Sequence, residues 1–257
     1  MRKLIILLTI CFIVILFATN IGFAEKPKAT ENTIAAGKKI YDQVCFFCHG
    51  STGKGDGPAA FPMAAYLAPR PRDFTNAVHK FRSTPTGTLP TDEDLFRTLT
   101  NGIPGFMPSF MGLTESERWQ VIYYIKSFSS IFEEEQVPPP ITFGEPIKAT
   151  AASIERGREV YMELKCWDCH GVEGKGDGPS AGNMFDDWRM KMTTQDLRKP
   201  FTFRGGENAE DIYRTFMTGL NGSPMPSYAT FLKGREEDAW HMVNYILSLS
   251  RPTRPTH

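Results

Sequence analysis

The feature that most constrains this chain is that it consists of one module written twice. GKKIYDQVCFFCHGSTGKGDGPAA (37–60) matches GREVYMELKCWDCHGVEGKGDGPSA (157–181), with one residue inserted before the second cysteine pair. Three further pairs of segments match in the same order: KFRS (80–83) with TFRG (202–205), LFRTLTNGIPGFMPSF (95–110) with IYRTFMTGLNGSPMPSY (212–228), and ERWQVIYYIKSF (117–128) with EDAWHMVNYILSL (237–249). Self-similarity of this length predicts two domains of the same fold.

The repeat also predicts where the domains begin and end. We expect domain 1 over residues 30–131 and domain 2 over residues 152–250, each about 100 residues long and able to form its own core. Residues 132–151 between them contain three consecutive prolines, which favour an extended, semi-rigid linker. Residues 251–257 form a short tail.

Both halves show helix signals and no convincing alternation of apolar and polar residues. Apolar positions recur at helical spacing in residues 32–44 and 153–165, just before each cysteine pair. Thr91 can cap a helix that ends at Gly102, and Thr114 with Glu117 forms a capping box before the next helix. We therefore predict an all-α fold, in which each domain has a few helices and long loops wrapped around one cofactor that substitutes for a larger core.

The first 24 residues differ from the rest. Arg2 and Lys3 precede an almost wholly apolar run (4–17), and small residues precede a cleavage point after Ala24. This pattern predicts a signal peptide over residues 1–24 and export to a periplasmic or equivalent extracytoplasmic compartment. The alternative is that this segment stays uncleaved and acts as a membrane anchor. The rest of the sequence has no second apolar run long enough to predict a membrane span. The formal net charge of zero gives no basic surplus for nucleic acid.

Every cysteine of the predicted mature chain lies in one of two Cys-x-x-Cys-His motifs. Zinc would need four ligands in each repeat, and His79 has no counterpart in domain 2. A cysteine pair for thiol–disulfide exchange would lie at the start of a helix that is flanked by β-strands, and the sequence predicts no strands next to these pairs. The motif is the attachment signature of haem c, so we predict two covalently bound haems, each held by two thioethers and a proximal histidine: Cys45, Cys48 and His49, and Cys166, Cys169 and His170.

The second axial ligand should recur in both repeats on a loop. The MPSF and MPSY segments supply Met107 and Met225, each after a loop rich in Gly and Pro. Filling core space is the ordinary role of methionine, but the match in register favours ligation. The alternative ligands, which have no aligned partner, are Met63 in domain 1 and Met184, Met190 and Met192 in domain 2.

With these motifs, residues 32–250 resemble a two-domain class I cytochrome c. The resemblance implies that a glycine and an aromatic residue four positions later cross closely against the last helix, at Gly37/Tyr41 and Gly157/Tyr161. It further implies that Pro58 and Pro179, nine residues after the haem histidines, accept the hydrogen bond from the histidine Nδ1. The paired Arg82 and Arg204 are candidates to bind haem propionates through their forked donors.

Two filled axial positions favour electron transfer, because six-coordinate iron has no free site for a substrate. We expect an exported dihaem carrier that exchanges electrons with redox proteins and is not an enzyme. The alternatives are a subunit built into a larger oxidoreductase complex and a dihaem peroxidase. The segment around residues 71–110 resembles cytochrome partners of exported molybdenum-containing oxidoreductases; a terminal acceptor is the other partner expected. Asp168, between the second pair of cysteines, should make the second site the more negative one.

Overall fold

The computed structural model describes residues 26–60 and 70–250. The predicted signal peptide, the candidate ligand Met63 and the tail (251–257) lie outside these residues. Domain 1 contains α2 (Glu31–Val44), α3 (Phe46–His49), α5 (Asp92–Asn101), α6 (Glu115–Lys126) and α7 (Ile131–Glu134). Domain 2 contains α8 (Ala151–Glu163), α9 (Trp167–His170), α10 (Ala209–Thr218) and α11 (Glu237–Leu249), with 3-10 turns η1 (Ala181–Asn183) and η2 (Pro200–Thr202).

The described residues contain helices and two isolated β-bridges but no β-strand. The predicted all-α class is confirmed, and local sequence explains the helix ends. Thr91 accepts from the Asp94 amide at 3.1 Å, while the Asp94 carboxylate accepts from the Thr91 amide at 3.0 Å, so both ends of a capping box are made. Gly102, with φ of 71°, ends the same helix.

Each domain is built on one pair of crossing helices, α2 with α6 and α8 with α11. A Cβ placed on Gly37 would lie 1.9 Å from the Gln120 carbonyl oxygen, and one on Gly157 would lie 2.0 Å from the His241 carbonyl oxygen. Only glycine allows backbones to approach this closely. The close crossing implied by the family resemblance is present in both halves.

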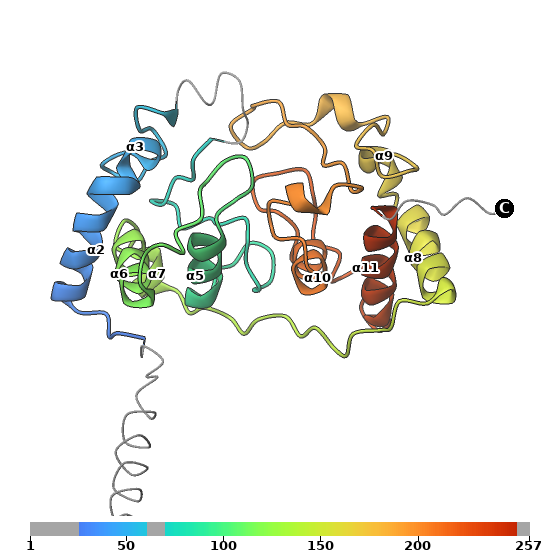
Figure 1. The fold of residues 1–257 in the computed structure, drawn as a ribbon, viewed down its shortest axis with the longest axis horizontal. Helices are drawn as coiled ribbons and strands as arrows, with labels where there is room; N and C mark the ends of the chain where they lie inside the picture. Colours follow the sequence, from blue (N-terminus) through green and yellow to red (C-terminus); the bar gives the residue numbers. More distant parts are fainter. Residues whose placement is uncertain (1–25, 61–69, 251–257) are drawn as a thin grey trace, which may run out of the picture.

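The two domains lie side by side, with α5 and α10 toward the middle and the crossing pairs at the outer ends (Figure 1). The linker runs in extended form past both domains, and hydrogen bonds hold it there. The Ile141 amide donates to the Ser83 backbone carbonyl at 2.7 Å, and the Trp240 indole donates to the Phe143 carbonyl at 2.6 Å. The linker is therefore part of the packed structure.

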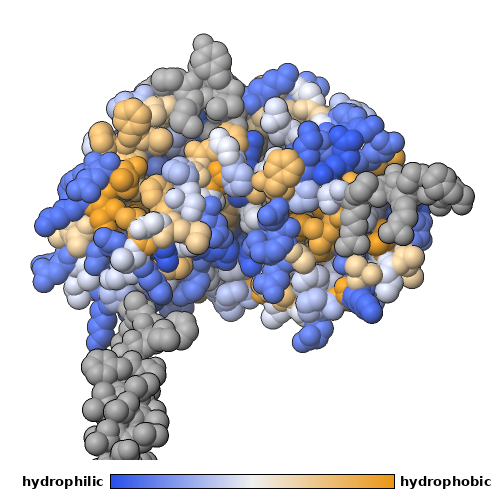
Figure 2. All heavy atoms as spheres, in the orientation of Figure 1, coloured by the Kyte–Doolittle hydropathy of each residue, from blue (hydrophilic) through white to orange (hydrophobic). Residues whose placement is uncertain are grey.

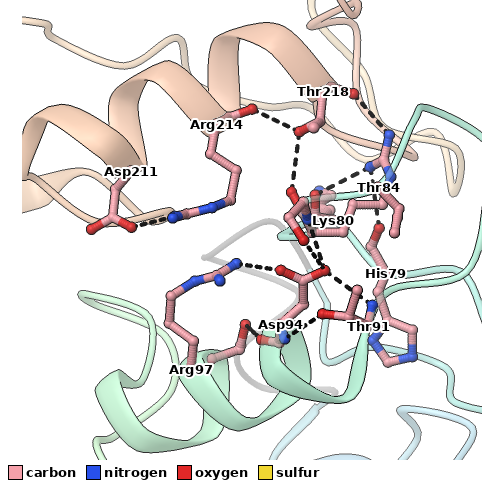
Figure 3. Close-up of polar contacts among 12 residues, drawn as sticks. His79, Lys80, Thr84, Thr91, Asp94, Arg97, Asp211, Arg214 and Thr218 are labelled. Carbon is pink, nitrogen blue, oxygen red and sulfur yellow. Dashed lines mark hydrogen bonds and ion pairs between the residues drawn. The ribbon is translucent and has the colours of Figure 1, made fainter. Parts of the chain in front are cut away.

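Side chains join the domains at their shared face. The Arg82 guanidinium donates to the Thr218 carbonyl at 2.7 Å, and the Arg204 guanidinium lies 4.1 Å from the centre of the Phe106 ring. In Figure 3, Arg97 and Arg214 extend from α5 and α10 into the space between these helices, each paired with an aspartate at the start of its own helix. The interface thus follows the repeat, with matched residues contributed from both sides.

Hydrophobic residues on the face shown in Figure 2 form several patches separated by hydrophilic ones. Across residues 26–60 and 70–250, no helix combines the length and the apolar character that crossing a bilayer requires.

Candidate haem sites

Each Cys-x-x-Cys-His motif forms a single tight turn at the end of the first helix of its domain. In domain 1 the His49 amide donates to the Cys45 carbonyl at 3.0 Å, and Gly50, with φ of 77°, ends the turn. The Tyr41 hydroxyl then donates to the Gly50 carbonyl at 2.7 Å. The same bond, from Tyr161 to Gly171, is 2.6 Å long in domain 2. The aromatic residue of the helix crossing therefore also anchors the motif.

Burial raises the pKa of all four cysteines of the described residues above the ordinary value of a thiol, and that of Cys45 and of Cys166 to about 12. A redox-exchange cysteine needs a lowered pKa, because the thiolate is the nucleophile. In the part of the chain that the structure describes, no three His, Cys, Asp or Glu side chains gather as metal ligands. Neither thiol exchange nor zinc binding fits these residues.

The two motif histidines are held in one tautomer by the backbone. The Nδ1 of His49 lies 3.1 Å from the Arg72 carbonyl oxygen, and the Nδ1 of His170 lies 3.0 Å from the Gln195 carbonyl oxygen. Because a carbonyl oxygen only accepts, Nδ1 carries the proton and Nε2 keeps its lone pair. Burial lowers the pKa of His49 to about 4 and that of His170 below its ordinary value. Both rings are neutral at pH 7 and can ligate iron through Nε2.

These contacts correct the prediction for Pro58 and Pro179, which are both exposed. The acceptors of the histidine Nδ1–H are the carbonyls of Arg72 and Gln195, in a segment that passes over the glycine loop. The crossing is close, since a Cβ on Gly55 would lie 2.2 Å from the Pro71 carbonyl oxygen. The glycines that follow the motif let this later segment reach the histidine.

Domain 2 contains a largely apolar cleft that fits a haem. About 1300 Å³ of it is free of atoms, a volume that includes space open to solvent. Both thiols of the motif, Cys166 and Cys169, line it together with His170. Aromatic and aliphatic side chains make up much of the remaining wall, among them Tyr161, Leu197, Phe203, Phe216, Tyr228, Met242 and Ile246. Thioether attachment and histidine ligation are both possible within this one space.

The methionine loops are pinned in the same way in both domains. The Ser109 hydroxyl donates to the Thr100 carbonyl at 2.7 Å, and the Ser227 hydroxyl donates to the Met217 carbonyl at 2.6 Å. Each loop starts at a glycine of positive φ, Gly102 or Gly219, where a Cβ would lie 2.5 Å from backbone atoms of the MPS segment. The serine of MPS thus has a structural role of its own.

Met225 lines the same cleft as His170, and so do Met184 and Met192. Met190 is not among the lining residues. The pinned loop and its match in domain 1 favour Met225 over the others, and its ligation of iron remains a prediction. Met107 occupies the matched loop position and packs against the core of domain 1.

The two candidate propionate arginines differ. Arg204 lines the cleft of domain 2 and has no hydrogen-bond or ion-pair partner within the described residues, as expected of a group that binds a carboxylate. Arg82 is 1% exposed, and its guanidinium donates to four main-chain carbonyls, those of His79, Lys80, Pro85 and Thr218. The structure therefore gives Arg82 a role between the domains in place of the predicted propionate contact.

The cleft also includes a residue that the sequence did not single out. Phe81, from domain 1, lines the cleft of domain 2 and lies 3.3 Å from the position of a Cβ on Gly205. Its place in the repeated FR pair is the signal that could have indicated a role at the interface. Domain 1 therefore contributes a side chain to the cleft of domain 2.

Comparisons with known proteins agree with this geometry. A family described as cytochrome c matches residues 154–250, and a family described as cytochrome C oxidase, cbb3-type, subunit III matches residues 32–125. Among solved structures, the chain is similar to a chain of the reducing HAO-like protein complex Kustc0457/Kustc0458 of Kuenenia stuttgartiensis. The TM-score is 0.79 and the identity 41%, over 87% of this chain and 98% of that chain. The comparison with curated proteins found no match.

Proposed function

The chain belongs to the class I c-type cytochromes, as two such domains in tandem, and from this premise we propose that it is an exported carrier that passes electrons between redox partners through two covalent haems. A haem c bound in each domain supplies a one-electron Fe(III)/Fe(II) centre. The protein holds that centre, excludes water from it and adjusts its potential.

One observation carries the proposal. In domain 2, the two thiols, the lone-pair Nε2 of His170 and the thioether of Met225 belong to one cleft. The Gln195 carbonyl fixes the histidine ring and makes its nitrogen a stronger ligand. The hydrogen bond from the Ser227 hydroxyl to the Met217 carbonyl holds the loop that carries Met225. If His170 and Met225 both bound the iron, it would have no free position for a substrate, which favours electron transfer over chemistry on a bound substrate.

Titration of the haem-loaded protein tests this assignment. We expect two covalent haems per chain and two reversible one-electron steps. Met107→Ala should lower one reduction potential and leave the other nearly unchanged, because methionine ligation raises the potential. If both potentials stay in place, Met107 is not the ligand of domain 1.

The dihaem peroxidase alternative requires one haem with an open axial position. It predicts a high-spin component in the absorption spectrum and turnover of hydrogen peroxide. A six-coordinate carrier shows neither. Detection of either signal in the purified protein would replace the carrier proposal with an enzymatic one.

A partner is suggested by the similar solved structure, whose chain belongs to a HAO-like protein complex. We propose that this chain likewise binds a redox protein, with a HAO-like protein as the first candidate and an exported molybdenum-containing oxidoreductase or a terminal acceptor as the others. Co-purification from the native host, followed by size-exclusion chromatography with each candidate, distinguishes them. Co-elution with none of them would favour a free carrier.

Export follows from the predicted signal peptide over residues 1–24. Cell fractionation should place the protein in the periplasmic or equivalent compartment. Conditions there are oxidising, and the predicted mature chain has no cysteines outside its two haem-attachment motifs that could form other disulfides. N-terminal sequencing should begin at Glu25. A retained N-terminus would instead support the membrane-anchor alternative.

A further inference from the structure

The methionine loop of domain 2 (219–225) is held from outside its own domain. It begins directly after Thr218, the last residue of α10. The Arg82 guanidinium of domain 1 donates to the Thr218 carbonyl at 2.7 Å, and both residues are 1% exposed. Figure 3 shows Thr218 at the end of α10, facing the domain 1 segment that carries Thr84. A buried contact between the domains therefore fixes the base of this loop.

A second contact with domain 1 lies within the loop itself. The side-chain oxygen of Asn221 accepts from the Thr86 hydroxyl at 3.1 Å and from the Gly87 amide at 3.4 Å. The next residue toward α10 is Leu220, whose amide donates to the Met225 carbonyl at 3.0 Å. The point that domain 1 holds is thus directly connected to the residue predicted to bind iron.

The domain 1 segment that makes these contacts, residues 82–87, is itself firmly held. The Ser83 amide and hydroxyl both donate to the Asp94 carboxylate, at 2.7 and 2.9 Å, and the Thr84 hydroxyl donates to the Leu89 carbonyl at 2.6 Å. Ser83, Thr84 and Asp94 are all buried. Donors that are already ordered restrict a partner loop at little further cost in entropy.

The methionine loop of domain 1 has no matching support. Within the part of the chain that the structure describes, residues 102–108 form no hydrogen bond with domain 2. Domain 2 contacts this loop through Arg204, whose guanidinium lies 4.1 Å from the centre of the Phe106 ring. The arginines of the two FR pairs therefore both face the methionine loop of the other domain, but only Arg82 forms a hydrogen bond there.

We propose that residues 82–87 of domain 1 position the methionine loop of domain 2 and thereby strengthen the binding of Met225 to iron. Arg82 and Thr86 act as positioning residues, since neither is among the residues that line the cleft. A loop held at two points loses less conformational entropy when its methionine binds, so the ligand competes better against others. The proposal rests on the proposed function, because it requires Met225 to be an axial ligand.

Competition with imidazole measures how firmly Met225 is held. In the oxidised, haem-loaded full chain, imidazole binds a six-coordinate haem only by displacing the methionine, so its apparent Kd reports the strength of methionine ligation. Met225→Ala frees one axial position and identifies the haem of domain 2 in the titration. Thr86→Val and Asn221→Ala should each tighten imidazole binding at this haem about fivefold, and Arg82→Lys about tenfold, because hydrogen bonds from charged groups are stronger.

Matched variants separate the interdomain bond from general damage to the segment. Thr88→Val is the control, because the Thr88 hydroxyl donates to the Pro85 carbonyl of its own domain at 2.7 Å; it should bind imidazole as the parent does. Thr86→Ser keeps the hydroxyl and should also match the parent. Thr86→Val combined with Asn221→Ala should have little more effect than either alone, since both remove the same bond. Additive effects would contradict the proposal.

Hydrogen exchange supplies a readout that does not depend on iron ligation. In Thr86→Val the amide of Leu220 should exchange faster than in the parent, while that of Ile103, at the matched position of domain 1, should not change. If Arg82→Lys fails to fold, Thr86→Val and Asn221→Ala decide the question.

The proposal is refuted if Thr86→Val and Asn221→Ala both bind imidazole as the parent does, or if they affect the haem of domain 1 equally. Two covalent haems with reversible reduction in the parent would then still support the proposed function. Absence of covalent haem or of reversible reduction in the parent would instead refute the proposed function itself.

Discussion

Gly37 is the position where one added carbon atom should do most damage to domain 1. In Gly37→Ala the new Cβ would lie 1.9 Å from the Gln120 carbonyl oxygen, whereas real Cβ atoms essentially never approach other atoms within 3.0 Å. Both contacting groups belong to helix backbones and cannot rotate aside. Helices α2 and α6 must therefore move apart by about 1 Å, because close-packed interiors have no spare volume.

Moving α2 and α6 apart would loosen contacts among the most deeply buried residues of domain 1. Tyr41, Val121 and Ile122 are each 0% exposed at the crossing, and a gap of about 1 Å forfeits a quarter to a half of their contact energy. Overpacking of this kind costs about 3 kcal/mol, and the better helix propensity of alanine returns about 1 kcal/mol. We expect the free energy of unfolding to fall by about 2 kcal/mol and the Tm of domain 1 by about 8–16 °C.

Thermal unfolding of the haem-loaded protein, followed by circular dichroism and by haem absorption, measures this effect. Gly112→Ala is the matched control, because a Cβ at the exposed Gly112 meets no atom within 4 Å; its stability should stay within about 0.5 kcal/mol of the parent. If Gly37→Ala is as stable as Gly112→Ala, the close crossing is not what holds α2 against α6.

Two further predictions concern single hydrogen bonds and pH. Tyr161→Phe keeps the buried ring but removes the 2.6 Å bond to the Gly171 carbonyl, so urea unfolding should show a loss of about 1–3 kcal/mol, and an unchanged midpoint would contradict that anchoring role. Burial would raise the pKa of Asp92, but hydrogen bonds from Lys126 at 2.6 Å and Lys26 at 3.0 Å outweigh burial and hold it below its ordinary value. A lowered folded-state pKa stabilises the protein above the unfolded pKa of about 3.9, and this stability is lost as the pH falls through the folded value. Asp92→Asn should therefore lose less stability than the parent in acid titrations below about pH 4; equal losses in the two proteins would exclude this contribution.

Local chemistry made much of the fold predictable. Thr91 and Gly102 mark both ends of α5, because a hydroxyl cap and a positive φ each depend on residues next to one another in the chain. The close crossing at Gly37 and Gly157 was implied by the family resemblance, and the structure has it because a side chain at either position would overlap the facing backbone. The four thiols and two histidines likewise lie in one short motif per domain.

The contacts missed by sequence reasoning are made by backbone atoms far apart in the chain. Arg72 and Gln195 support the haem histidines through their carbonyl oxygens, which every residue has, so no side-chain type marks such a position. The forked donors of Arg82 predict a propionate contact, but the partners of Arg82 include the Thr218 carbonyl of the other domain. The packing of the two domains determines which backbone carbonyl accepts from the guanidinium, and this packing cannot be predicted from the sequence of either repeat alone.

The two residues that fix the haem histidines show what the duplication leaves free to change. The hydrogen bond to each histidine depends on the backbone carbonyl at positions 72 and 195, so the side chain there can change without loss of that bond. In domain 1 this residue is Arg72, whose guanidinium lies 5.1 Å from the centre of the Trp188 ring; in domain 2 it is Gln195, whose side-chain amide donates to the Thr202 hydroxyl at 2.5 Å. Two copies of one module can therefore differ in the side chains around the histidine while they keep the carbonyl that orients its ring.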